Sequence, residues 1–308
     1  MRGAEQVANE DRNDLNAIKQ AVSHVFMGRS QAIDLALICL LANGHLLIED
    51  VPGSGKTSLS AALARALGLA FNRVQCTNDL LPADITGLSV FDRQTGQFSV
   101  KDGPVFTQVL LADELNRAPS KTQSALLQAM EEREVTIDTI TKPLPTPFLV
   151  IATQNPRENI GTFDLPESQL DRFSLSMAIG RPNRDVQKEI LMQAPRKAET
   201  VPAVISADDV IFMQKQVAEI ATHEGVLSYL LRLSDEIEAR CHITLSVRYR
   251  QQLLALARAC AYLAGRDFVT PDDVKAMVPH SLHHRLARSD NAARQDVLAS
   301  LLSDIAMP

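Results

Sequence analysis

The feature that most constrains this fold is a short loop sequence, DVPGSGKT, at residues 50–57. An apolar run at residues 45–49 precedes the loop, and a helix-forming run at residues 58–67 follows it. A strand, a glycine-containing loop ending in Gly-Lys-Thr and a helix form the arrangement that a phosphate-binding loop needs. The backbone amides of the loop would converge on a phosphate at the positive end of the helix. Lys56 would then reach the β- and γ-phosphates of a nucleotide, and the hydroxyl of Thr57 would hold Mg²⁺.

The loop departs from the general pattern, Gly-x4-Gly-Lys-[Ser/Thr], at its first position, where Asp50 stands. This position lies at the end of the strand and supplies less of the amide cradle than residues 53–57. A carboxylate that points away from the loop is compatible with phosphate binding, whereas one that points inward would repel phosphate by roughly 1–4 kcal/mol.

Four more short apolar runs follow the loop, at residues 71–76, 109–112, 148–153 and 174–179. Helical stretches separate some of these runs, notably residues 121–133. Buried strands that alternate with helices predict a parallel sheet covered by helices on both faces. With the strand before the loop included, we expect an α/β core with a five-stranded parallel sheet. Ligands bind such sheets at the carboxyl ends of the strands, where the phosphate loop lies.

The character of the sequence changes after residue 182, where strand-like runs give way to helical periodicity. Residues 206–209 and 270–273 each carry the capping residues that begin a helix. We therefore expect two domains, an α/β nucleotide-binding core at residues 1–182 and a small all-α domain at residues 183–308.

Composition argues against several classes of protein. Aromatic residues make up 4% of the chain and tryptophan is absent, so the cores must be aliphatic, which favours packed helices over a β-sandwich. The formal net charge of −6 gives no whole-chain attraction to nucleic acid or to an anionic membrane. The four cysteines lie far apart without a Cys-x-x-Cys, as in a reducing compartment. The first residues lack the apolar core of a signal peptide, and residues 33–47 are too short and interrupted to span a bilayer. We expect a cytoplasmic protein without a membrane span.

Polar side chains follow two of the predicted strands. The run at residues 109–112 ends in Asp113 and Glu114. Asp113 would orient Mg²⁺ or its waters, while Glu114 would polarise the water that attacks the γ-phosphate. After the run at residues 148–153, Asn155 carries an amide that could position the same water or touch the γ-phosphate. Because Asn-Pro also favours turns, an ordinary turn is an equal alternative at this point.

An arginine, Arg172, lies at the end of a predicted helix just before the last strand, in the run LPESQLDRF at residues 165–173. Together with the phosphate loop, the two acids and Asn155, this run resembles the AAA+ ATPases. The runs DELNRAPSKTQSALLQAMEER at residues 113–133 and ATQNP at residues 152–156, with LPESQLDRF, resemble the MoxR group within the helix-2-insert clade. The resemblance covers nearly the whole chain, from about residue 13 to residue 305.

The resemblance implies roles for individual residues. Val25 and Gly28 match the segment that lines the adenine pocket, and Asn155 matches sensor 1. Arg172 matches the arginine finger, which enters the site of the neighbouring subunit and stabilises transition-state charge in trans. Arg248 begins a helix of the all-α domain, which corresponds to the AAA+ lid, and matches the sensor 2 arginine.

Some segments match the clade in character. MoxR proteins usually have Pro where Val247 stands, which is a departure, but their phosphate loops also begin with Asp-Val-Pro-Gly. Residues 84–106 resemble the helix-2 insert, and residues 135–144 resemble the insertion before sensor 1.

ATP and Mg²⁺ are the implied cofactors, with Thr57 and Asp113 as metal ligands. The residues implied in nucleotide binding are Val25, Gly28, Pro52, Gly53, Ser54, Gly55, Lys56, Thr57, Ser58, Asp113 and Arg248. The residues implied in catalysis are Lys56, Glu114, Asn155, Arg172 and Arg248.

Three further groups have weaker signals. Arg117 and Lys121 lie near Glu114 in sequence and are either further trans-acting basic groups or solvated helix residues. The run at residues 131–134 (EERE) is most simply a solvated face. A third group consists of His280, His283, His284, Cys241 and His242. Its spacing lacks a zinc pattern, so a polar helix face is favoured over a metal site.

The leading hypothesis is an ATP-hydrolysing motor of chaperone type that forms a homo-oligomeric, hexameric ring. The resemblance also implies a protein client and a partner with a von Willebrand A domain. One alternative is a nucleic-acid-dependent motor of the same clade, against which stand the net negative charge and the few aromatic residues for stacking. Another is a nucleotide-gated scaffold without useful turnover, against which the complete set of catalytic residues argues.

Overall fold

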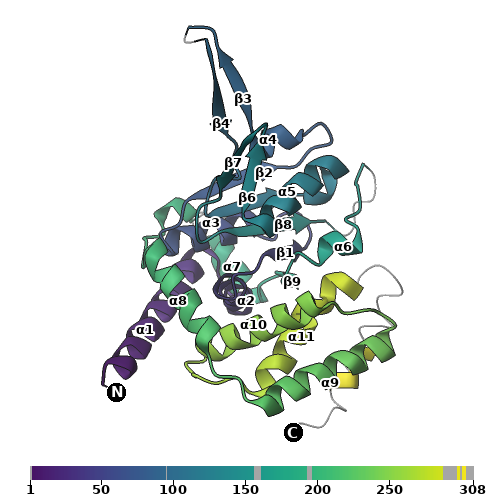
Figure 1. The fold of residues 1–308 in the computed structure, drawn as a ribbon. Coiled ribbons are helices and arrows are strands. Elements are labelled where there is room, and N and C mark those ends of the chain that lie inside the picture. The colour runs from purple at the N-terminus through teal and green to yellow at the C-terminus, as the bar shows by residue number, and fades with distance from the viewer. Residues whose placement is uncertain are drawn as a thin grey trace.

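The computed structural model of the chain describes residues 2–94, 96–155, 161–192, 196–286, 297–298 and 300–302. Figure 1 shows an α/β part with a central sheet and, beside it, a set of packed helices from the second half of the chain. Within these residues no helix is both long enough and apolar enough to cross a membrane.

Five parallel strands form the central sheet, in the order β2-β5-β8-β1-β9. The strands are β1 (Leu46–Glu49), β2 (Phe71–Gln75), β5 (Val109–Asp113), β8 (Leu149–Gln154) and β9 (Leu175–Met177). Each of the five apolar runs in the sequence therefore forms a strand, and the prediction of a five-stranded parallel sheet is confirmed. Because the strands are parallel, their carboxyl ends meet at one edge, and the segments that lead into them meet at the opposite edge.

Helices cover both faces of this sheet, and the alternation of side chains along each strand divides the core in two. In β1, for example, Leu46 and Ile48 belong to one buried cluster, whereas Leu47 belongs to the other. The first cluster contains α1 (Arg2–Val25), α2 (Ser30–Leu41) and α3 (Lys56–Ala66). The second contains α5 (Ser120–Glu132). Both faces are thus apolar, as the continuous apolar runs of the strands require.

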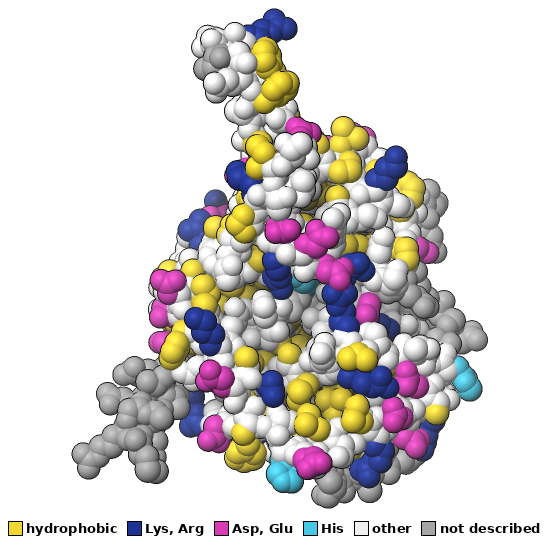
Figure 2. Space-filling view, in the orientation of Figure 1, with side chains coloured by type: hydrophobic (Ala, Val, Ile, Leu, Met, Phe, Trp, Pro, Cys, Tyr) yellow, Lys and Arg dark blue, Asp and Glu magenta, His cyan; other side chains and the backbone are white. Residues whose placement is uncertain are grey.

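Two antiparallel hairpins extend from the core at the segments that resemble clade insertions. One joins β3 (Gly87–Asp92) to β4 (Gln97–Asp102), after the short α4 (Pro82–Thr86), and projects from the body of the molecule (Figure 1). Figure 2 shows hydrophobic side chains along it. The Phe91 and Phe98 rings pack with centroids 5.1 Å apart, and both side chains are exposed. The other joins β6 (Glu134–Ile137) to β7 (Ile140–Pro143).

In the described part of the chain, five α-helices follow the sheet, and they reach it mainly through α2 and β9. They are α7 (Arg184–Met192), α8 (Ala207–Glu219), α9 (Glu224–Cys241), α10 (Val247–Leu263) and α11 (Pro271–Leu286). Helix α10 packs on α2, and α11 packs on β9, so the first buried cluster continues from the sheet into these helices. An α/β core followed by a helical lid is therefore confirmed. The boundary at residues 182 and 183 stays a prediction, because apolar packing continues across both parts.

Candidate active site

The phosphate loop connects the carboxyl end of β1 to the first residue of α3. Gly53 and Gly55 have φ angles of 79° and 90°, a left-handed region that suits glycine, and Gly55 caps α3. A Cβ at Gly53 would find no atom within 4 Å, so space lies open beside the loop. Lys56 folds back over the loop, and its Nζ donates to the carbonyl oxygens of Asp50 (2.6 Å) and Val51 (3.3 Å). The predicted loop thus has the backbone shape and the ammonium group that an anion site needs.

The Asp50 carboxylate has partners outside the amide cradle. Its Oδ1 accepts from the backbone N–H of Val51 at 2.7 Å, and its Oδ2 accepts from the N–H of Gly180, after β9, at 2.8 Å. Both carboxylate oxygens are therefore used by amides other than those of residues 53–57. This arrangement removes the repulsion that an inward-pointing carboxylate would cause, and it ties the start of the loop to the segment after β9.

The segment between α1 and α2 contacts the phosphate loop. Arg29 donates to the carbonyl oxygen of Ser54, and its guanidinium lies 4.1 Å from the centre of the Phe26 ring. Burial lowers the pKa of Arg29, while the Asp50 charge opposes that change. At Gly28, φ is 70° and a Cβ would lie 2.9 Å from the side chain of Val186 in α7. Val25, at the end of α1, and Gly28 therefore lie in a segment that touches the loop, and their role in the adenine pocket stays a prediction.

Asp113, the last residue of β5, is buried and has a partner on each oxygen. Its Oδ1 accepts from the Thr153 hydroxyl at 2.6 Å, and its Oδ2 forms an ion pair with the guanidinium of Arg73 at 2.7 Å. Thr153 belongs to the neighbouring strand β8, and Arg73 belongs to β2 on the other side. Neither partner was predicted from the sequence. Thr153 lies level with Asp113 on β8, whereas Arg73 lies two residues before Gln75, the residue of β2 that pairs with Asp113. Neither contact could be found from the sequence without the order and register of these strands.

Glu114 follows Asp113 in a left-handed conformation, with φ of 57°. Its backbone N–H donates to the same Thr153 hydroxyl at 2.8 Å, so one buried hydroxyl links both acidic residues. The carboxylate accepts from the Gln75 amide at 3.1 Å and lies 3.4 Å from the guanidinium of Arg117. This backbone turn separates the directions of the two acidic side chains. Lys121 lies exposed in the first turn of α5.

Asn155 lies between the acidic pair and the phosphate loop. It follows β8, which is hydrogen-bonded to β5 on one side and to β1 on the other, and it is buried. The backbone N–H of Asp50 donates to the carbonyl oxygen of Gln154 at 3.2 Å, which joins this strand end to the start of the loop. A strand spacing of about 4.8 Å places the ends of β5 and β1 roughly 10 Å apart, a span that a metal ion with water and phosphate ligands can bridge. Pro156, the last residue of the ATQNP run, lies outside the described residues.

The residues at this edge fit a nucleotide phosphate with Mg²⁺. Ser54 Oγ is buried and has no hydrogen-bond partner among the described residues, and the open space at Gly53 lies next to it. The amides at the start of α3 and Lys56 supply positive charge, while the Asp113 carboxylate and the Thr57 hydroxyl are oxygen ligands of the kind that Mg²⁺ prefers. Of the remaining loop residues, Pro52, Gly53 and Ser58 are exposed, and Gly55 and Thr57 are half-buried.

Arg172 and Arg248 lie at the opposite edge of the sheet. Arg172 follows α6 (Glu167–Leu170) and precedes β9, and the backbone N–H of Ser174 donates to the carbonyl oxygen of His45, just before β1. His45 and Asp50 are separated by the whole length of β1. Five residues at about 3.3 Å each place the two edges roughly 16 Å apart. In this chain, therefore, neither arginine lies beside the phosphate loop.

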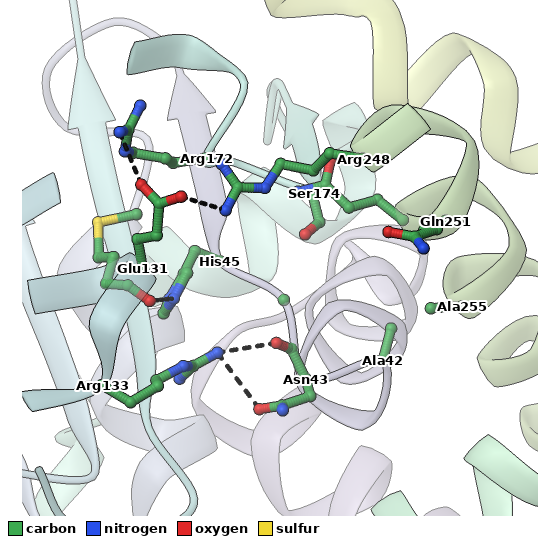
Figure 3. A pocket seen from close by; sticks show the side chains of 13 residues that line it. Ala42, Asn43, His45, Glu131, Arg133, Arg172, Ser174, Arg248, Gln251 and Ala255 are labelled. Carbon is green, nitrogen blue, oxygen red and sulfur yellow. Dashed lines mark hydrogen bonds and ion pairs between the residues drawn. The ribbon is translucent and has the colours of Figure 1, made fainter. Parts of the chain in front are cut away.

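A single carboxylate holds these two arginines together. Glu131, near the end of α5, forms an ion pair through Oε2 with Arg172 at 2.7 Å and, through Oε1, with Arg248 (Figure 3). The hydrogen bond from Arg248 and then the Arg172 charge lower the pKa of Glu131. All three residues line a cavity of about 290 Å³ between the core and α10. Figure 2 shows basic and acidic side chains side by side around the hollow on this face.

The expectation that residues 131–134 form a solvated face holds for Glu131, Glu132 and Glu134, which are exposed, and is wrong for Arg133. Glu131 is exposed even though it makes the two ion pairs just described. Arg133 donates to the carbonyl oxygen of Asn43 at 2.9 Å (Figure 3). It also donates to the carbonyl oxygen of Phe148, and thereby joins the end of α5 to the segments before β1 and β8. The physical reason is that α5 ends at Glu132, with Arg133 in a left-handed conformation that turns its side chain back towards the sheet.

The histidines of α11 also differ from the expected polar face. His284 is buried, and its Nδ1 lies 2.9 Å from the Ser176 hydroxyl in β9. His283 lies 3.5 Å from the carboxylate of Glu49, at the end of β1. This inward placement follows from the packing of α11 on β9. Within the described part of the chain, no three His, Cys, Asp or Glu side chains come together as a metal site.

Comparisons with known proteins agree with both parts of the fold. Residues 45–175 match the ATPase family associated with various cellular activities (AAA), and residues 237–302 match the AAA lid domain. The chain is 38% identical over 296 residues to the uncharacterized protein YeaC of Bacillus subtilis, covering 93% of this chain and 92% of that protein. It is 36% identical over 322 residues to chaperone MoxR1 of Mycobacterium tuberculosis, covering 99% of this chain and 85% of the relative. The crystal structure of a proposed ATPase from Cytophaga hutchinsonii superposes with a TM-score of 0.89 at 32% identity and covers 100% and 98% of the two chains. Because this similarity runs through both the sheet and the lid helices, the chain belongs to the MoxR-type AAA+ ATPases.

Proposed function

We propose that this chain hydrolyses ATP in a site shared between neighbouring subunits of a ring. The observation that carries the proposal is the position of Arg172 and Arg248, paired on Glu131 at the edge of the sheet opposite the phosphate loop. A transferring phosphoryl group needs positive charge at its equatorial oxygens. Two arginines that lie roughly 16 Å from their own loop can supply that charge to a second chain docked against this edge.

One subunit binds and activates the substrate. The amides of the phosphate loop and Lys56 bind the β- and γ-phosphates of ATP. Thr57 and Asp113 would hold Mg²⁺, which neutralises phosphate charge when bound. Glu114 accepts the proton of the attacking water, and Asn155, which lies between the acidic pair and the loop, orients that water.

The neighbouring subunit supplies Arg172 and Arg248. Both guanidiniums already converge on the two oxygens of one carboxylate, an arrangement of donors that also suits the oxygens of a terminal phosphate. Arg172 acts as the arginine finger, and Arg248 acts as the sensor 2 residue of the same composite site. Charge from these groups stabilises the transition state, because it is fixed in place before the reaction.

The wider role that we infer is chaperone-like remodelling of a protein client by a hexameric ring in the cytoplasm. In support, the relative from Mycobacterium tuberculosis is named a chaperone, and the MoxR resemblance implies a partner with a von Willebrand A domain. A nucleic-acid motor is less well supported, since the formal net charge is −6.

Mixed rings test the shared site. Arg172→Ala should bind ATP nearly normally but lose roughly 10³-fold in turnover, as other arginine fingers do. Glu114→Gln should bind ATP and hydrolyse almost none, because it lacks the carboxylate that accepts the proton. In a mixture, some sites combine an intact Glu114 with an intact Arg172 from the next subunit, so part of the turnover should return.

Two controls accompany this experiment. Each variant alone must be inactive, and subunit exchange must be shown, for example by energy transfer between differently labelled chains. An arginine acting in its own subunit gives no rescue, because every chain in the mixture then carries a lesion in its own site. With both controls met, absence of recovered turnover at every mixing ratio refutes the shared site.

A further inference from the structure

We propose that Asp171 and Arg285 are positioning residues that set the placement of Arg172 and Arg248 across the junction of core and lid. The inference rests on the proposed function, in which those two arginines act on the ATP of a neighbouring subunit. It assigns a task to an ion pair that touches neither the phosphate loop nor the acidic pair.

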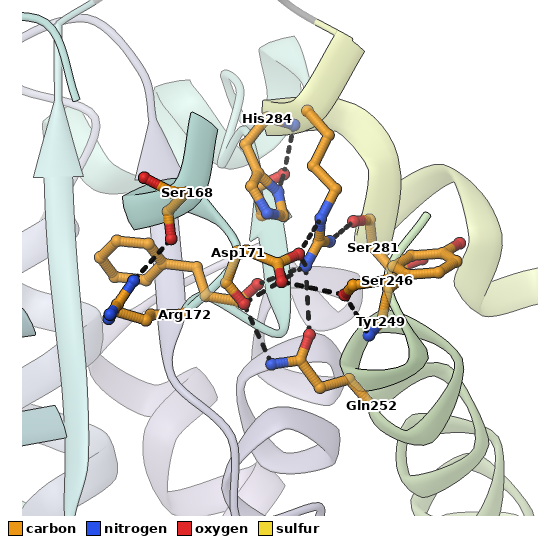
Figure 4. A network of polar contacts seen from close by, with 11 residues as sticks. Ser168, Asp171, Arg172, Ser246, Tyr249, Gln252, Ser281 and His284 are labelled. Carbon is orange, nitrogen blue, oxygen red and sulfur yellow. Dashed lines mark hydrogen bonds and ion pairs between the residues drawn. The ribbon is translucent and has the colours of Figure 1, made fainter. Parts of the chain in front are cut away.

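The Asp171 carboxylate is held by two elements of the lid (Figure 4). Two N–H groups of Arg285, in α11, donate to its Oδ1, with Nε at 3.1 Å and Nη2 at 2.9 Å. The hydroxyl of Ser246, the residue that caps α10, donates to Oδ2 at 3.0 Å. Hydrogen bonds between charged groups are the strong ones, and two donors on one oxygen restrict the direction of the guanidinium.

The same lid residues also hold the backbone around Arg172. The side-chain amide of Gln252, in α10, donates to the Asp171 carbonyl oxygen at 3.2 Å, and Arg285 donates to the Phe173 carbonyl oxygen at 3.4 Å. Arg285 and Gln252 in turn meet at 3.1 Å. Hydrogen bonds from the lid thus hold the backbone on both sides of Arg172, so a movement of the lid must move this arginine.

The ion pair lies where water screens it little. The Arg285 side chain is 11% exposed, and its guanidinium packs 4.9 Å from the centre of the buried Tyr249 ring. The Tyr249 hydroxyl is fixed in turn by Ser281 at 3.1 Å. Loss of one partner from a part-buried pair leaves an uncompensated charge, so the geometry at Asp171 depends on both partners being present.

Each arginine is attached closely to this pair. Arg172 is the next residue after Asp171, and Arg248 lies two residues after Ser246, in the first turn of the helix that Ser246 caps. One carboxylate therefore fixes the origins of both side chains, which then converge on Glu131. A displacement of about 1 Å at a reacting centre can lower a rate by roughly 100-fold. The Asp171–Arg285 pair therefore affects catalysis by fixing the positions of Arg172 and Arg248, although it does not touch the reacting atoms itself.

The test compares Arg285→Gln with the arginine finger itself. Arg285→Gln should leave the affinity for a fluorescent ATP analogue unchanged and lower kcat roughly 10- to 100-fold, because the donated arginines are misplaced. Mixing it with Glu114→Gln should restore turnover, since the intact arginines then come from the second variant. In an Arg172→Ala background, Arg285→Gln should cause little further loss, because its main target is already gone.

A matched control removes a lid ion pair elsewhere. Arg266 pairs with the buried Asp273 within the lid, far in sequence from both arginines. Arg266→Gln should lower the unfolding temperature but leave kcat at the wild-type value. If Arg285→Gln cannot be purified folded, Asp171→Asn removes the same charge interaction at constant size and is expected to give the same loss and the same rescue.

The outcomes separate this inference from the proposed function. If Arg172→Ala is inactive while the folded Arg285 and Asp171 variants keep wild-type kcat, the inference is overturned and the shared site stands. Loss without rescue in mixtures also overturns it, because the ion pair then acts on its own subunit. If Arg172→Ala keeps its turnover, the proposed function and the inference fall together.

Discussion

Replacement of Thr153 by valine tests whether one hydroxyl holds both acidic residues of the candidate site in place. The Thr153 hydroxyl is buried, donates to the Asp113 carboxylate at 2.6 Å and accepts from the backbone N–H of Glu114 at 2.8 Å. Valine keeps the branched shape and removes both hydrogen bonds. We expect Thr153→Val to destabilise the fold and to lower ATP turnover, because both acidic residues then lose a common anchor.

The magnitude follows from the two bonds and from the backbone of Glu114. A hydrogen bond to a charged group contributes about 1.5–3 kcal/mol, and a buried N–H left without a partner costs about 1–3 kcal/mol. Glu114 has φ of 57°, and a left-handed residue other than glycine costs roughly 1 kcal/mol, which the bond to Thr153 helps to offset. Because one hydroxyl makes both bonds and the N–H is partly buried, we expect a total of about 2–4 kcal/mol. In a chain of this size that corresponds to a fall in unfolding temperature of roughly 3–6 °C.

Thr107→Val is the matched control for this measurement. The Thr107 hydroxyl is also buried but has no hydrogen-bond partner in the described part of the chain. The same atomic change should therefore shift stability by less than about 0.5 kcal/mol, or raise it, because an unsatisfied polar group is removed. Scanning calorimetry and steady-state phosphate release compare the two variants with wild type. Equal unfolding temperatures for both variants would refute the assignment of Thr153 as the anchor.

Two further predictions concern single groups. Lys56→Ala should weaken ATP binding strongly, because the ammonium that reaches the terminal phosphates is lost; an unchanged affinity for a fluorescent ATP analogue contradicts the phosphate-loop assignment. Burial and then the Arg133 charge lower the pKa of His45 to about 3, so the folded chain keeps it neutral, whereas the unfolded chain protonates it near pH 6.5. The contribution of the neutral His45 to the free energy of unfolding is complete above pH 6.5. It is lost as the pH falls below that value, by about 1.4 kcal/mol for each pH unit. Chemical unfolding at pH 7.5 and 5.5 should show this loss in wild type and less of it in His45→Gln; equal losses would count against a buried neutral His45.

The strands were predictable because each is short and bounded by turn or polar residues, and all except β2, whose sequence is FNRVQ, are largely apolar. The position of the phosphate loop and of the acidic pair then followed from one rule, that ligands bind at the carboxyl ends of parallel strands. That rule uses only the direction of the chain through each strand. It therefore brought Lys56, Asp113, Glu114 and Asn155 to one edge before any strand order was known.

The contacts that hold the acidic pair were not predictable in the same way. Arg73 and Thr153 each lie 40 residues from Asp113, one before it and one after it. Their meeting depends on β5 lying between β2 and β8, and on the register of both pairs. A sequence pattern is enough to predict which face of a strand is apolar. To predict a salt bridge between two strands, the order of the strands must be known as well.

The ion-pair partners of Glu131 were not predictable for a related reason. In sequence Glu131 lies in a run of charged residues at the end of a helix, the usual place for solvated side chains. Its partner Arg248 lies 117 residues later, on a helix whose position is set by the packing of α10 on α2. No local sequence pattern relates two residues that are so far apart in the chain. The arrangement of lid on core is therefore what turns a surface carboxylate into the centre of an ion-pair group.

The placement of the two arginines shows how chain direction limits the mechanism. A residue that follows a parallel strand and a residue that precedes a neighbouring one lie at opposite edges of the sheet, and no side-chain rotation joins them. Arg172 precedes β9, while Lys56 follows β1, so the length of a strand separates them in every copy of this chain. Arg248 is brought to the same edge as Arg172 by the lid and is held there through Glu131. If hydrolysis needs either guanidinium at the γ-phosphate, a second chain has to present it, and assembly of at least two chains becomes a requirement of the chemistry.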